Sequence, residues 1–144
     1  MTTVPPASTS RIPGIPVPVS PGELIDKITI LEIKVRRFSD EAKLDNVRRE
    51  LTLLGSARDG AITPSEDLGR LTADLRTVNE ALWEIEDAIR DCERMADFGP
   101  RFVELARSVY HRNDRRCALK RQINELVGSE IIEEKGYVDY HRPP

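Results

Sequence analysis

Apolar residues recur at intervals of three and four along most of the chain, which is the spacing of one helix face. The longest series runs without a miss through positions 68, 71, 75, 78, 82, 85, 89 and 92. It predicts a helix over 63–95, opened by a capping-box pair of Thr63 and Glu66. A second series predicts a helix over 100–127 that ends at Gly128.

The segment after residue 19 predicts a helix that is apolar on two sides. Ser20 and Glu23 have capping-box spacing, and Pro21 takes the first helical position. One stripe consists of Leu24, Ile28, Leu31, Val35 and Phe38. Because Ile30 and Ile33 lie on the opposite side, this helix is either central in the bundle or part of an oligomer interface.

The remaining segments complete an all-α prediction. A helix is expected over 40–54, with Gly55 as its stop and a polar loop over 55–62. The short break at 97–100 makes the last two helices an antiparallel hairpin. The predicted fold is therefore an antiparallel four-helix bundle with a long hairpin of the third and fourth helices.

The two ends of the chain differ from this helical part. Prolines at positions 5, 6 and 13 predict a disordered tail over 1–15, followed by a single helical domain over 16–140. After the last helix, Ser129 is expected to cap a short turn, and residues 136–140 are expected to lie extended across the bundle.

Charge is distributed unevenly along the chain. Residues 64–97 hold ten acids and four bases, whereas residues 100–127 hold seven bases and three acids. These segments are expected to pair in the hairpin. The net charge of −3 gives no case for nucleic-acid binding. No apolar run spans a membrane, no signal peptide is visible, and two cysteines suit a reducing compartment, so a cytoplasmic location is predicted. A homodimer is expected on other grounds, because Ile30 and Ile33 need cover and the long third helix outgrows a small bundle.

Polar residues recur where a bundle does not need them. The third helix carries one stripe, composed of Asn79, Trp83, Glu86, Asp87 and Arg90. The fourth helix carries another, composed of Tyr110, Asn113, Cys117, Lys120 and Asn124. On the first helix, Lys27, Lys34 and Glu32 flank the apolar stripe. Together these side chains would line a cleft between three helices.

A purely structural interpretation stays open for the same residues. Glu86 and Arg90 have the spacing of an ordinary ion pair, Asn113 could fix the helix register, and Trp83 could cover the core. Four carboxylates could converge on a divalent cation: Glu32, Glu50, Glu86 and Asp87. None of these four residues has a glutamate four positions away, which is the Glu-x-x-x-Glu spacing of a helical magnesium site, so no metal or cofactor is predicted.

Several motifs resemble a bacterial all-helical family known only as a numbered domain of unknown function. They are the opening PVSPGELIDKITILEIK at 18–34, KLDNV at 43–47, NxxLWxxEDxxR at 79–90, LARSVYxxND at 105–114, and KRxIN at 120–124 followed by EEK at 133–135. The match covers about residues 16–140, and the tryptophan motif is also similar to a second uncharacterised helical family.

The resemblance implies a substrate class through an association of the family with glycosyltransferase and polysaccharide gene clusters. It implies a protein that binds or acts on a phosphorylated or nucleotide-activated sugar in glycan or glycosylated-metabolite assembly. Acid–base roles would fall to Glu86, Asp87 or Glu32. Hydroxyls would be bound by Asn79, Asn113 and Asn124, and the sugar or base would stack on Trp83 and Tyr110. Phosphates would be bound by Lys27, Lys34, Arg90, Arg116 and Lys120.

Two other functions stay open. The chain could be a non-catalytic interaction module that docks on a glycosyltransferase or another partner protein. Small helical dimers of the chorismate-mutase type also use clefts of arginine, lysine and glutamate, although the spacing of the pairs at 36–37 and 48–50 matches them poorly.

Overall fold

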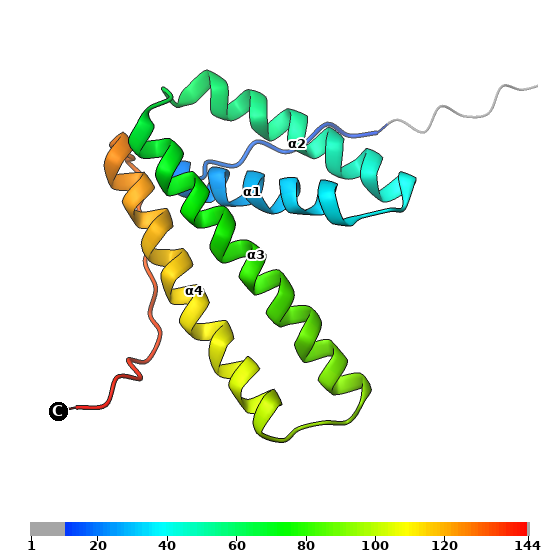
Figure 1. The fold of residues 1–144 in the computed structure, drawn as a ribbon. Helices are drawn as coiled ribbons and strands as arrows, with labels where there is room; N and C mark the ends of the chain where they lie inside the picture. The colour runs from blue at the N-terminus through cyan, green and yellow to red at the C-terminus, as the bar shows by residue number, and fades with distance from the viewer. Residues whose placement is uncertain (1–10, 144) are drawn as a thin grey trace, which may run out of the picture.

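A computed structural model describes residues 11–143, which contain four α-helices and no strand (Figure 1). The helices are α1 (Pro21–Arg37), α2 (Glu41–Ala61), α3 (Glu66–Arg94) and α4 (Pro100–Val127). The all-α class and the long α3–α4 hairpin are therefore confirmed. None of the helices in this part of the chain combines the length and the apolar character that crossing a bilayer requires.

The helix ends follow local sequence signals. Ser20 caps α1 by accepting a hydrogen bond at 3.2 Å from the backbone three residues on, and Pro21 opens the helix as predicted. Asp40 and Ser65 cap α2 and α3 in the same way, at 2.9 and 3.1 Å. Gly128 ends α4 in the left-handed conformation, with a φ of 70°.

Two predicted boundaries are wrong. The second helix continues through Gly55 for two more turns, where the sequence predicted a polar loop. A glycine inside a helix costs only about 1 kcal/mol relative to alanine, and Ile62, directly after the helix, is buried in the core. The third helix is capped by Ser65 and not by Thr63, because Leu68 enters the core and its N–H bonds Ser65.

Helix α1 is central, since it contacts each of the other three helices. Its side chains join those of α3 and α4 in one core, which includes Ile25, Ile28, Leu75, Leu119 and Ile123. Each such side chain contributes about 1.5–3 kcal/mol by leaving water. Ile33 is also buried within the chain, so it needs no cover from a second copy, whereas Ile30 is only half-buried.

Helices α3 and α4 extend beyond α1 and α2 as a two-helix hairpin (Figure 1). The predicted pairing of acidic α3 with basic α4 is wrong: across residues 11–143, no ion pair joins these two helices. Two acids of α3 bind α1 instead, where Glu80 pairs with Arg36 and Glu84 pairs with Arg37, and three others pair with arginines of α3 itself. The hairpin is therefore held together by its apolar seam.

The segment after α4 returns alongside that helix without regular secondary structure (Figure 1). Tyr140 binds Asp114 on α4, so the predicted packing of residues 136–140 on the bundle is confirmed at that point, and Glu133 adds a contact to Lys120. The hydroxyl of Ser129 accepts a hydrogen bond from Ile131, but no helical turn follows it. Residues 11–19 are irregular and largely exposed, and the rest of the predicted tail, residues 1–10, lies outside the described residues.

Candidate functional site

A buried carboxylate lies where α1, α3 and α4 meet. Asp26 is 1% exposed, and its Oδ1 accepts hydrogen bonds from Arg116 Nε at 2.8 Å and from Asn79 Nδ2 at 2.9 Å. Its Oδ2 accepts a second bond from Arg116 Nη2 at 2.5 Å, which makes the pair bidentate. This bonding to Asp26 is the main reason that the pKa of Arg116 is raised. Asn79 also donates to Thr29 Oγ1 at 2.9 Å.

A cleft of about 440 Å³ opens beside this network, between the same three helices. We call it the helix cleft. Its lining consists of Ile30, Asn79, Leu82, Trp83, Glu86, Asp87, Arg90, Asn113 and Arg116. Seven of these nine residues are predicted site residues, so the structure brings most of the predicted set together.

Trp83 lines the helix cleft and packs against two residues at the end of α1, Arg37 and Phe38. Its ring lies at 55° to the ring of Phe38, with centroids 6.0 Å apart, and the guanidinium of Arg37 lies 5.7 Å from its centroid. On the same helix, Glu86 and Arg90 form the expected ion pair at 2.8 Å. Because both are solvent-exposed, this pair contributes only about 0.3–0.5 kcal/mol and leaves both groups able to bind a ligand.

A second hollow of about 550 Å³ lies between α4 and the C-terminal segment. We call it the tail cavity. Its lining consists of Tyr110, Asn113, Asp114, Arg116, Cys117, Lys120, Lys135, Tyr137, Val138 and Tyr140. Asn113 and Arg116 line both hollows, so they stand at the junction between them.

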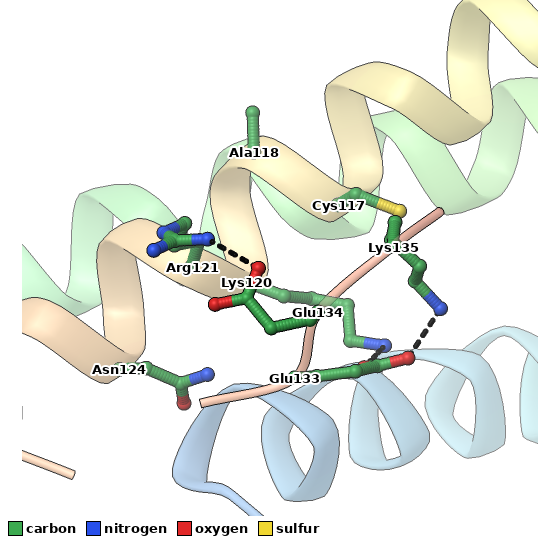
Figure 2. Close-up of a pocket in the computed structure, with 8 residues that line it drawn as sticks. All are labelled: Cys117, Ala118, Lys120, Arg121, Asn124, Glu133, Glu134 and Lys135. Carbon is green, nitrogen blue, oxygen red and sulfur yellow. Dashed lines mark hydrogen bonds and ion pairs between the residues drawn. The ribbon is translucent and has the colours of Figure 1, made fainter. Parts of the chain in front are cut away.

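Lys120 is a buried cation in the lining of the tail cavity. Its Nζ contacts Glu23 Oε2 at 2.5 Å and Glu133 Oε2 at 3.3 Å. Burial alone would lower the pKa of Lys120, but the bond to Glu23 and the nearby carboxylates outweigh it and raise the pKa. Figure 2 shows Glu133 between Lys120 and Lys135, in a smaller hollow of about 230 Å³ that adjoins the tail cavity.

Asn124 has a packing role. Its Oδ1 accepts a hydrogen bond at 2.7 Å from the backbone N–H of Gly22, in the first turn of α1. A side chain at Gly22 would place Cβ only 2.4 Å from the carbonyl oxygen of Lys120, so the glycine is what lets α1 approach α4. The amide oxygen of Asn124 is thus occupied, and this residue lines neither the helix cleft nor the tail cavity.

Three other predicted site residues are not brought to either hollow. Glu32 binds Arg76 on α3, with Oε2 2.9 Å from Arg76 Nε, so it is not grouped with Glu86 and Asp87. Lys27 and Lys34 share the α1 face of Ile30 but do not line the helix cleft, and Lys27 lies 3.9 Å from Glu23. Among residues 11–143, no three His, Cys, Asp or Glu side chains are grouped as metal ligands would be.

Two parts of the site were not predicted from the sequence. The first is the buried pair of Asp26 and Thr29; the signal was a carboxylate between Ile25 and Ile28 in the sequence, two apolar residues that are buried in the core. The second is the contribution of the C-terminal segment, namely Lys135, Tyr137, Val138 and Tyr140. That segment has no periodicity, so its position on α4 has no local signal.

Comparison with known proteins finds no match among curated proteins and none among solved structures. A family match does cover residues 15–143, which is nearly the whole chain and includes every residue of both hollows. The protein therefore belongs to the family of unknown function DUF6165.

Proposed function

We propose that the protein binds a phosphorylated or nucleotide-activated sugar, with the sugar ring in the helix cleft. The observation that carries this proposal is the lining of that cleft, where the indole of Trp83 stands beside two carboxylates, two amides and two guanidinium groups. An aromatic ring packs on the apolar face of a sugar, while carboxylates and amides bind its hydroxyls.

Arg116 is the proposed phosphate ligand. Its Nε and Nη2 bind Asp26, whereas its Nη1 makes no hydrogen bond within residues 11–143. Because Asp26 fixes the plane of the guanidinium, the side chain loses little further conformational entropy when its Nη1 binds a phosphate. An activated sugar, and a role in glycan or glycosylated-metabolite assembly, are also what the family resemblance of the sequence motifs implies.

Asp87 is the proposed acid–base residue if the bound sugar reacts. It lines the helix cleft and has no ion-pair partner in the described part of the chain, whereas Glu86 is paired with Arg90. The carboxylate of Asp87 is therefore free to contact a group of the bound sugar. Both cysteines are free thiols, in keeping with a cytoplasmic location, which we also propose.

Calorimetry with a panel of sugar 1-phosphates and nucleotide sugars tests the proposal. We expect saturable binding, weakened about tenfold by Trp83→Leu and by Arg90→Ala. Arg94→Ala is the matched control, since it removes a similar exposed ion pair one turn further along α3. No binding by any member of the panel, or equal losses for Arg90→Ala and Arg94→Ala, would contradict the proposal.

A second function, association with a protein partner, is favoured by the end of the α3–α4 hairpin that lies beyond α1 and α2. Residues 82–97 hold six acids and two bases, residues 100–116 hold five bases and two acids, and no ion pair joins the two helices there. Met95, Phe98 and Val103 expose apolar surface between these charges. We propose a second copy as the partner, because an antiparallel pair of hairpins sets the acidic helix of each against the basic helix of the other.

Sedimentation analysis tests this self-association. We expect a dimer that weakens with added salt and that Val103→Glu converts to a monomer. Leu53→Glu on α2 is the control, because Leu53 is 62% exposed and Val103 is 51% exposed. A monomer at all salt concentrations would instead favour docking on a different protein, such as a glycosyltransferase, which co-purification would detect.

A further inference from the structure

The tail cavity gathers all three tyrosines of the chain. Tyr110 comes from α4, and Tyr137 and Tyr140 come from the C-terminal segment. The same hollow is lined by three cations and by one carboxylate, Asp114. A volume of about 550 Å³ is within the range of small-molecule sites, and the lining combines flat apolar rings with positive charge.

The cavity is built by fastening the C-terminal segment to α4 at two points. At one point Lys120 binds Glu133, at 3.3 Å, and Arg121 binds the next residue, Glu134, at 3.4 Å. At the other point, Tyr140 donates a hydrogen bond to Asp114 Oδ2 at 2.5 Å, and its ring meets the ring of Tyr110 edge-on, with centroids 4.9 Å apart. Tyr137 lies between these points, is exposed, and makes no hydrogen bond within residues 11–143. Its ring is therefore available to a ligand.

The charges define the other half of the ligand. Lys135 and Lys120 share the carboxylate of Glu133 (Figure 2), and Lys120 is also bound by Glu23, so Lys135 is the lysine whose charge is balanced only by the shared carboxylate. Arg116, which lines both hollows, contributes the Nη1 of its guanidinium, which is unbonded within the described residues. A ligand that satisfies this lining is planar and aromatic at one end and carries negative oxygens at the other.

We propose that the tail cavity binds the nucleoside diphosphate part of a nucleotide-activated sugar. The inference rests on the proposed function, because the sugar then lies in the helix cleft and the diphosphate passes Arg116 between the two hollows. The base stacks against Tyr110 and Tyr137, and the phosphate oxygens compete with Glu133 for Lys120 and Lys135.

The test is calorimetry on the full chain with three probes: a set of nucleoside diphosphates (UDP, ADP and GDP), inorganic pyrophosphate, and a sugar 1-phosphate. We expect at least one nucleoside diphosphate to bind about tenfold more tightly than pyrophosphate, because only it supplies a base to stack. Tyr137→Ala should abolish this preference. Phe98→Ala is the matched control, since Phe98 is an exposed aromatic residue far from the cavity.

Glu133→Gln gives a second, opposite readout. Removing the internal anion should tighten nucleoside diphosphate binding by up to about fivefold, the equivalent of one exposed ion pair. Equal affinities for the nucleoside diphosphates and pyrophosphate, or unchanged affinity in both Tyr137→Ala and Glu133→Gln, would overturn the inference. If the sugar 1-phosphate still binds and depends on Trp83, the proposed function stands without this subsite. If none of the three probes binds, both fail.

Discussion

The variant Asp26→Asn tests the centre of the structure. It keeps the shape of the side chain but removes the charge from a group that accepts three hydrogen bonds at 2.5–2.9 Å. In asparagine an NH2 group replaces one of the two carboxylate oxygens. This new donor would face an N–H donor of Arg116 or Asn79. Because a hydrogen bond to a charged group is worth about 1.5–3 kcal/mol, losing two would cost about 3–6 kcal/mol.

The side chain of Arg116 is 28% exposed, so it can recover part of this loss by turning toward water. We therefore expect the free energy of unfolding to fall by about 2–4 kcal/mol, with Tm lower by about 5–12 °C. Urea denaturation followed by circular dichroism measures the free energy of unfolding, and thermal denaturation measures the Tm. The control, Glu84→Gln, breaks an exposed pair with Arg37 and should cost less than about 0.5 kcal/mol.

A double-mutant cycle separates the pair from other effects of the substitution. Arg116→Met and the double variant complete the cycle, and we expect a coupling energy of about 1.5 kcal/mol or more. A cost below about 0.5 kcal/mol for Asp26→Asn, or additive effects of the two substitutions, would refute the view that a buried ion pair joins α1 to α4.

Two further predictions concern packing and ionisation. Gly22→Ala should destabilise by about 1–3 kcal/mol in urea denaturation, because its Cβ would overlap the α4 backbone, whereas Gly55→Ala, which has open space, should stabilise by up to about 1 kcal/mol. The bond to Asp114 favours the neutral phenol and raises the pKa of Tyr140 to about 12. Ultraviolet titration should show that this tyrosine ionises last, and Asp114→Asn should bring its pKa back toward about 10.

Helix periodicity was sufficient to predict α3 and α4, because each has a long apolar stripe that packs on a neighbour. It failed at Gly55, where a weak local preference competed with burial of Ile62 after the helix. A propensity of about 1 kcal/mol is easily outweighed by burying one isoleucine, so the helix continued.

Helix periodicity also explains the part of the site that could be predicted. Residues on α3 could be placed on one face from their spacing alone, and Asn79, Trp83 and Arg90 do line one cleft. Which cation meets which acid depends on how helices cross, and the spacing carries no such information. Hence Arg116 was assigned to phosphate without its partner Asp26, and the pairing of Glu32 with Arg76 was not foreseen.

The most direct test of the proposed sugar site uses the fact that Trp83 is the chain's single tryptophan. Its indole N–H gives one isolated proton resonance, and the ring lines the helix cleft. Titration with sugar 1-phosphates and nucleotide sugars should shift this resonance in a saturable way, and Asp87→Asn should weaken the binding. A resonance that stays in place at millimolar concentrations of every ligand would contradict the account.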